Sequence, residues 1–219
     1  MTDTGPVLGF DSSGPFCTLA LRAGDRLLWH KTWEGARGQA EQLFPLLEEG
    51  LAATKLGWRD LERLGVGTGP GNFTGIRIAV AAARGLALSL DIPAIGVSRL
   101  EAQALGLPRP VLSTVSAPRG GIYLQEFTEE GPANPRLCLD GELSAQRFTP
   151  GLACVGAAAP QLAALTCGPV CDARFPLADA IARIAAGADP AACALRPAPL
   201  YLRGADAAPA SDAPPRMLQ

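Results

Sequence analysis

Two glycine-containing segments hold the residues of this chain whose types and spacing suit the binding of an anion. The turn Asp11-Ser12-Ser13-Gly14 directly follows an apolar run, and the loop Gly69-Pro70-Gly71 precedes a long apolar stretch. A helix N-terminus offers unpaired N–H groups and the positive end of a dipole, so glycine loops that lead into helices often hold phosphate. The candidate contacts of a phosphate-bearing cofactor are therefore Asp11, Ser12, Ser13, Gly14, Gly69 and Gly71.

The glycine loop does not match the patterns that define phosphate-binding loops. A P-loop requires a lysine followed by serine or threonine after its last glycine, and no such pair follows Gly71 or Gly75. A dinucleotide fingerprint that starts at Gly67 and Gly69 requires a third glycine where Asn72 stands. Two interpretations therefore stay open: the glycines touch a ligand, or they only permit a tight turn from a strand into a helix.

The elements that would position these residues follow from the spacing of apolar side chains. Around the loop we predict two strands, at 64–67 and 94–97, and a helix at 74–90 that is apolar nearly all round. Upstream we predict three strands and an amphipathic helix, at 7–11, 16–22, 27–33 and 39–53. Pro45 should mark the start of that helix or a kink in it. Downstream we expect a hairpin, a further strand and two short helices, at 111–127, 151–156, 157–165 and 177–186.

Composition and charge limit the classes of protein to which the chain can belong. Of its 219 residues 48% are hydrophobic and 18% charged, which indicates a globular protein with a substantial core. The formal net charge is −2 without a block of lysine or arginine, so a long nucleic-acid groove on this chain is not expected. We find no signal peptide pattern and no apolar run of membrane-spanning length, and we expect a cytoplasmic protein whose six cysteines are reduced.

The order of the predicted elements, β-β-β-α-β-α-β-α, resembles the actin-like, ribonuclease-H-like fold. In that fold a carboxylate ends the first strand, as Asp11 does here, and the following turn often faces a phosphate. The expected architecture is an α/β mixed sheet with flanking helices and two subdomains. We predict an N-terminal subdomain at 1–106, a smaller degenerate one at 107–203, and a flexible tail at 204–219.

The central stretch resembles the TsaB family, also called YeaZ. The resemblance is carried by Gly69-Pro-Gly-Asn-Phe-Thr-Gly-Ile-Arg-Ile78, by Gly96-Val-Ser-Arg-Leu100, and by a C-terminal signature at Pro199-Leu-Tyr-Leu-Arg203. One departure stands before the hairpin, where relatives commonly show Asp-Ala-Arg and this chain has Ser116-Ala-Pro-Arg119. That departure weakens the expectation of nucleotide binding.

The resemblance implies a role in making threonylcarbamoyladenosine next to the anticodon of tRNAs that read codons starting with A. TsaB-type proteins do not catalyse the transfer. They form a heterodimer with a related subunit, TsaD, which holds the metal and transfers the threonylcarbamoyl group, and an ATPase, TsaE, joins the pair. The resemblance therefore implies that ATP or ADP, where it binds, does so at the complex, and that tRNA is bound only through the complex.

The residues independently favour a chain without catalysis or a metal. The catalytic relative needs two histidines one helical turn apart, and this chain has a single histidine, His30, in a predicted strand. A Ser-His-Asp mechanism would also depend on His30, and no G-x-S-x-G elbow is present. We therefore predict that His30 is structural.

If the chain performs no reaction, its function lies in its surface. The helices at 39–53 and 74–90 are too apolar for a single core, and we predict that they pack on the corresponding TsaD helices. The same face would form a homodimer when TsaD is absent. The predicted contact residues are Leu43, Leu47, Ile76, Arg77, Val80, Ala83 and Arg84.

Three rival functions have weaker support in the sequence. An actin-like nucleotide-binding kinase or ATPase would use the turn at 11–14 and the loop at 67–75, but no general base is evident. A ribonuclease-H-type nuclease needs clustered carboxylates, and the strand at 64–67 offers none. A peptidase is the weakest alternative because of the histidine argument.

Overall fold

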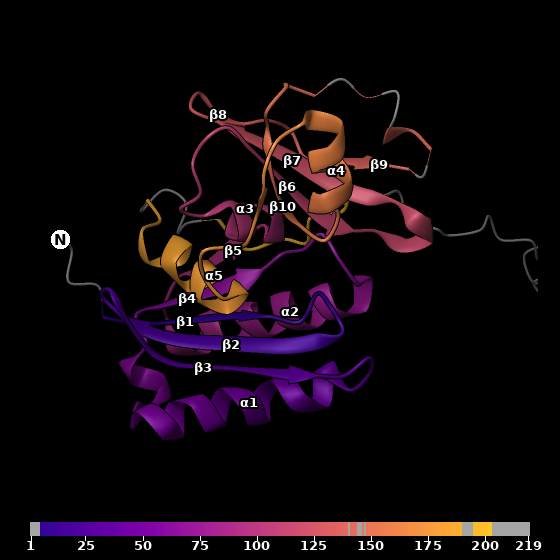
Figure 1. The fold of residues 1–219 in the computed structure, drawn as a ribbon. Helices are drawn as coiled ribbons and strands as arrows, with labels where there is room; N and C mark the ends of the chain where they lie inside the picture. Colours follow the sequence, from indigo (N-terminus) through magenta and orange to yellow (C-terminus); the bar gives the residue numbers. More distant parts are fainter. Residues whose placement is uncertain (1–4, 140, 144–145, 147, 190–194, 203–219) are drawn as a thin grey trace, which may run out of the picture.

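The computed structural model describes residues 5–139, 141–143, 146, 148–189 and 195–202. Within these residues the chain forms two mixed β-sheets with helices packed on them (Figure 1). The predicted α/β class, with mixed sheets and flanking helices, is confirmed. The predicted tail at 204–219 lies outside the described residues.

The first sheet brings the predicted anion-binding segments to one edge. β1 (Pro6–Asp11), β2 (Phe16–Ala23) and β3 (Arg26–Glu34) form an antiparallel meander. β4 (Arg63–Gly67) pairs in parallel with β1, and β5 (Ala94–Val97) pairs in parallel with β4. The strand order is β3–β2–β1–β4–β5, so the carboxyl ends of three parallel strands meet at one edge, where open α/β sheets bind ligands.

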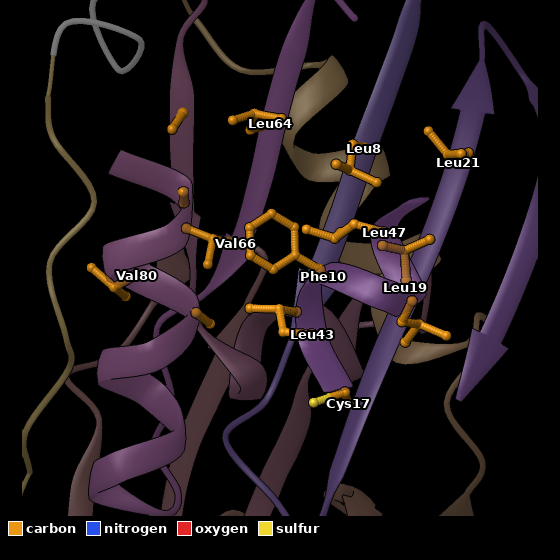
Figure 2. Close-up of a cluster of buried hydrophobic side chains, with 14 of the residues drawn as sticks. Leu8, Phe10, Cys17, Leu19, Leu21, Leu43, Leu47, Leu64, Val66 and Val80 are labelled. Atoms are coloured by element: carbon orange, nitrogen blue, oxygen red, sulfur yellow. The ribbon is translucent and has the colours of Figure 1, made fainter. Parts of the chain in front are cut away.

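Helices cover both faces of this sheet. α1 (Gln39–Thr54) and α2 (Phe73–Leu90) lie on the face to which β1 presents Leu8 and Phe10. Figure 2 shows Phe10 among side chains from α1 and β4, including Leu43. Val7 points the opposite way, because successive side chains alternate along a strand, and it packs with α5 (Leu177–Ala186).

The second sheet has the order β11–β10–β6–β7–β8, and β9 also pairs with β7. Its strands are β6 (Val111–Ser116), β7 (Ile122–Thr128), β8 (Gly131–Pro132), β9 (Arg136–Cys138), β10 (Ala153–Gly156) and β11 (Val170–Cys171). The shorter helices and turns are α3 (Arg99–Ala104), α4 (Ala159–Thr166), η1 (Trp58–Asp60) and η2 (Pro118–Gly120). α3 and α4 pack on this sheet, whereas the later α5 returns to the first sheet. The division of the chain at residue 106 stays a prediction.

The two long helices begin and end close to where their periodicity predicts. α1 starts at Gln39, so Pro45 lies inside it rather than at its start. Proline has no N–H, so the carbonyl of Glu41, four residues earlier, receives no hydrogen bond from position 45. Glu41 is an exposed residue of the first turn, so water can bond to that carbonyl instead.

α2 corrects one expectation about membranes. With 18 residues and a mean hydropathy of 1.4, it is long and apolar enough to cross a membrane by those two criteria, contrary to the sequence reading. In this fold its inner face, from Gly75 to Ala83, is buried against the first sheet. A core helix of a globular protein passes the same two criteria.

Candidate functional site

The two predicted glycine segments lie against each other beside a cavity between the two sheets. Asn72 N donates a hydrogen bond to Ser13 O at 2.6 Å, which joins the loop to the turn after β1. The cavity, which we call the central cavity, has a volume of about 500 Å³. It is lined by Ser13, Gly14, Pro15, Ala36, Gln39, Gly71, Asn72, Arg99, Val115, Ser116, Ala117, Pro118 and Ala157.

Only half of the predicted cofactor contacts line this cavity. Ser13, Gly14 and Gly71 do so, whereas Asp11, Ser12 and Gly69 are buried and are not among its lining residues. Asp11 Oδ1 accepts a hydrogen bond from Ser13 N at 2.5 Å. Its Oδ2 is buried without a hydrogen-bond partner in the described part of the chain. Burial raises the pKa of Asp11 above its ordinary value, and the Arg99 charge opposes this effect.

The N-terminus of α2 is closed by the chain itself. Asn72 Oδ1 accepts from Gly75 N at 2.9 Å, which makes Asn72 the N-cap, and Ser12 Oγ donates to Gly75 O at 2.8 Å. A Cβ on Gly75 would lie 1.9 Å from Ser12 O, so this glycine permits close contact of two backbones. The structure thus favours the packing interpretation of the glycine loop.

These contacts do not fit a nucleotide polyphosphate. Such a group needs free backbone N–H donors, yet the N–H groups of Ser13, Asn72 and Gly75 already bond to acceptors of this chain. We therefore derive no step through a nucleotide at these positions. The same geometry weighs against the kinase or ATPase alternative.

Arg99 is the one charged side chain among the described residues that line the cavity, and the sequence analysis did not assign it to a site. It directly follows the N-cap Ser98 of α3, and its guanidinium carbon lies 5.2 Å from the centroid of the Phe16 ring. The sequence places Arg99 two residues after Val97, the last residue of a predicted strand, and the structure shows that this strand is parallel to β4. Ligands bind at the carboxyl ends of parallel strands, so this position was the available signal. The lining also includes Ser116 and Pro118, from the segment that departs from the family pattern, whereas Arg119 is not among the lining residues.

For five of the seven residues predicted to contact a partner, the prediction is wrong, because their side chains are buried in the core of this chain. Their exposed fractions are 3% or less, and all belong to the cluster between the first sheet and its two helices: Leu43, Leu47, Ile76, Val80 and Ala83. The apolar side of each helix is needed to cover β1, β2 and β4. A partner can meet only the opposite side of α1 and α2.

The other two predicted contacts, Arg77 and Arg84, are exposed but bind a segment of this chain. Arg84 Nε donates to Pro197 O at 2.7 Å, and Arg77 Nε donates to the Tyr201 hydroxyl at 3.0 Å. Leu200 N donates to Thr68 O at 2.9 Å. We call residues 195–202, which these bonds hold along α2, the strap.

Beside the strap, α2 presents a surface that we call the outer α2 face. Leu88 is 85% exposed and Phe73 49%, and the Tyr201 ring lies 5.1 Å from that of Phe73. The residues of this face are Phe73, Arg77, Ala81, Arg84, Gly85 and Leu88, all exposed. A hollow of about 360 Å³ lies between its C-terminal half and the strap, lined in part by Leu88 and Leu195.

His30 lies on the exposed edge strand β3. Its Nε2 is 3.4 Å from Thr18 Oγ1, which also lies 2.8 Å from Thr32 Oγ1. Partial burial lowers the pKa of His30, and the charge of Asp179 opposes this effect. Among the described residues no group of three or more histidine, cysteine, aspartate or glutamate side chains is placed to hold a metal ion.

Comparison with known protein sequences finds relatives that match different shares of this chain. A family model, TsaD: tRNA N6-adenosine threonylcarbamoyltransferase, matches residues 34–134. The tRNA threonylcarbamoyladenosine biosynthesis protein TsaB of Escherichia coli is 30% identical over 135 residues, which cover 57% of this chain and 55% of that protein. The Haemophilus influenzae protein of the same name is 31% identical over 130 residues and is 54% covered, so the chain spans about half the length of both relatives. An uncharacterized Mycobacterium tuberculosis protein is 32% identical over 212 residues, 93% of this chain and 94% of that protein.

Solved structures share the fold at low sequence identity. One is described as an uncharacterized protein with similarity to peptidase YeaZ from Pseudomonas aeruginosa. It superposes with a TM-score of 0.70 at 20% identity, and the match covers 91% of this chain and 100% of that protein. YeaZ from Pseudomonas aeruginosa gives a TM-score of 0.61 at 22% identity, over 77% and 82% of the two chains. The predicted actin-like, ribonuclease-H-like α/β class is confirmed.

Proposed function

Because this chain belongs to the TsaB (YeaZ) family, we propose that it serves in making threonylcarbamoyladenosine in tRNA as a subunit that performs no chemistry itself. The reacting adenosine would be the one next to the anticodon in tRNAs that read codons starting with A. The catalyst would be a TsaD-type subunit that forms a heterodimer with this chain, and a TsaE-type ATPase would join them. Such a protein would work in the cytoplasm.

The observation that carries the proposal is the outer α2 face. Leu88 and Phe73 expose large apolar side chains there, while Ala81 and Gly85 between them leave room for close approach of another helix. A Cβ on Gly85 would have no described atom within 4 Å. Exposed apolar surface of this kind supports association with a partner.

The family model that matches residues 34–134 supports a TsaD-type partner. This stretch includes both α1 and α2, so a TsaD-type chain would carry a related pair of helices. Two related helix pairs can pack as a four-helix interface. A homodimer through the same face is the expected alternative when the partner is absent.

The residues of the chain support the absence of catalysis. Its single histidine, His30, lies on the edge strand β3 with its Nε2 3.4 Å from Thr18 Oγ1, and it is not among the residues that line the central cavity. Asp11 is enclosed beneath the cavity by its bond from Ser13 N. With a net charge of −2, we assign tRNA binding to the complex rather than to this chain.

The cellular test removes the gene from its host and measures threonylcarbamoyladenosine in tRNA by mass spectrometry of nucleosides. We expect the modified nucleoside to be lost and to return when the wild-type chain is supplied. An unchanged amount in the deletion strain would contradict the proposed function. Modification of tRNA by the purified chain alone would contradict its non-catalytic role.

The interface test uses Leu88→Glu, because a charge at this exposed position should leave the fold intact and oppose an apolar partner. We expect co-purification with the TsaD-type subunit to fall at least about tenfold. Leu165→Glu is the matched control, since Leu165 is a 47% exposed leucine on α4, and its co-purification should be unchanged. A folded Leu88→Glu protein that co-purifies normally would contradict the proposed face.

A further inference from the structure

Two arginines of the outer α2 face are held in place by the strap. Arg77 and Arg84 are seven residues apart, which is two helical turns or about 10 Å along α2. Arg77 Nε donates to the Tyr201 hydroxyl, and its guanidinium carbon lies 3.9 Å from the centroid of the Phe73 ring. Arg84 Nε donates to Pro197 O. Both guanidinium groups are therefore oriented before a partner binds.

The outer edges of these two guanidinium groups are open to a partner. Both side chains are exposed, and among the described residues neither arginine forms an ion pair or a hydrogen bond through its terminal Nη groups. The helix itself contains no aspartate or glutamate. A guanidinium that uses only its Nε keeps the edge formed by its two terminal nitrogens, which binds a carboxylate through two parallel hydrogen bonds. The outer α2 face thus offers two carboxylate-binding edges two turns apart.

The neighbouring helix α1 presents the opposite charge. Glu41 and Glu48 are also seven residues apart, and both are exposed. In the part of the chain that the structure describes, neither forms an ion pair, unlike Glu49, which binds Lys31. α1 and α2 pack side by side on one face of the first sheet. A partner that lies across both helices must therefore present acidic groups to α2 and basic groups to α1, which fixes its orientation.

These opposite charges argue against nucleic acid as the occupant. The rings of Phe73 and Tyr201 beside Arg77 would suit the stacking of a nucleobase. A phosphate backbone that crosses this surface would, however, meet the carboxylates of α1, whereas a protein can match both signs. The 85% exposed Leu88 on the same face also favours a protein.

Resting on the proposed function, we propose that Arg77 and Arg84 determine the specificity of the outer α2 face by pairing with two carboxylates two turns apart on one helix of the TsaD-type subunit. The strap is the positioning segment, through Tyr201 and Pro197. The family model that covers α1 and α2 supports this choice of partner, since a TsaD-type chain would present a related pair of helices.

The binding test measures by calorimetry the affinity of the full chain for the purified TsaD-type subunit, at low salt and at about 300 mM NaCl. We expect Arg77→Glu and Arg84→Glu each to weaken binding about tenfold or more at low salt and to reduce its salt dependence. Tyr201→Phe keeps the ring but releases Arg77, and it should weaken binding about threefold. Arg136→Glu, at an exposed arginine of β9, is the control and should bind as wild type. Folded arginine variants that bind as wild type would overturn the proposal, and if Leu88→Glu still abolishes binding, the proposed function stands without it.

A charge swap then identifies the partner's carboxylates. Each aspartate or glutamate on the two related helices of the TsaD-type subunit is changed to lysine and tested with Arg77→Glu and with Arg84→Glu. We expect one lysine to restore binding to each variant, at positions about seven residues apart. Restoration by none would overturn the proposal. So would Arg77→Glu losing only self-association of this chain, which assigns the arginines to a second copy, or losing only tRNA binding by the isolated chain, which assigns them to nucleic acid.

Discussion

Arg84 Nε donates to Pro197 O at 2.7 Å and so joins α2 to a segment 113 residues later in the chain. The strap also lies close to β5. A Cβ placed on Gly96 of β5 would be 3.2 Å from Pro197 Cβ. β5 is an edge strand of the first sheet. The strap thus links α2 to the region of β5 and forms one wall of the hollow beside the outer α2 face.

We expect Arg84→Ala to loosen the strap without unfolding the protein. The loss of one charged hydrogen bond at a partly exposed site should lower the free energy of unfolding by about 1–2 kcal/mol in urea titrations. The amide of Leu200, which bonds to Thr68 O, should exchange hydrogen faster than in wild type. Arg59→Ala is the control for loss of an exposed arginine. Wild-type exchange at Leu200 in Arg84→Ala would show that this bond does not hold the strap.

Two glycines of α2 should respond in opposite directions to the same substitution. Gly75→Ala places a Cβ 1.9 Å from Ser12 O, a backbone atom that cannot move alone, so we expect a loss of about 3 kcal/mol or more. Gly85→Ala places its Cβ in open space among the described atoms and should stabilise the helix by about 0.5–1 kcal/mol. Thermal and urea unfolding measure both changes. A Gly75→Ala protein as stable as Gly85→Ala would contradict the packing role of the loop.

The long helices and the first-sheet strands could be predicted because their signals are local. Apolar spacing and flanking glycine or proline residues mark α2 and β4 without any knowledge of the fold. The two- and three-residue strands β8, β9 and β11 could not be predicted, since their pairing is decided by the strand beside them. The orientation of α2 was also hidden, because a helix that is apolar on most sides does not show which side the sheet covers.

The candidate site was predictable only in part for the same reason. Asp11 and the glycine loop are recognised by their place after apolar strands, and the structure does bring their segments together. Arg99, in contrast, joins them only through the parallel pairing of β5 with β4. The contacts of Arg77 and Arg84 with the strap join residues more than 110 positions apart, and no local pattern encodes them.

Asp179 should be a sensitive position because it is shared by two arginines between α5 and β2. Its Oδ2 lies 2.8 Å from Arg183 Nε, and its Oδ1 lies 3.8 Å from Arg22 Nε, with side chains of Arg22 and Asp179 at most 4% exposed. Asp179→Ala leaves the buried Arg22 charge without its partner, so we expect a loss of about 3–5 kcal/mol in urea unfolding. Glu49→Ala, which breaks the exposed pair with Lys31, should cost less than about 1 kcal/mol. Equal losses in the two variants would contradict this assignment.

The buried carboxyl of Asp11 predicts how stability should depend on pH. Burial raises its pKa in the folded protein above the ordinary value of 3.8, so the unfolded chain releases this proton at a lower pH than the folded chain does. The contribution of Asp11 to stability therefore falls as pH rises from about 3.8 through the folded value, because the folded chain must then bury a carboxylate.

Asp11→Asn keeps an oxygen for Ser13 N and does not titrate. Its stability relative to wild type should therefore be higher at about pH 7 than at about pH 4 in urea titrations. Since the Arg99 charge lowers the pKa of Asp11, Arg99→Gln in the wild-type background should extend the fall to higher pH and make the total loss of stability larger. A stability difference between Asp11→Asn and wild type that is the same at both pH values would show that Asp11 does not ionise differently in the folded chain.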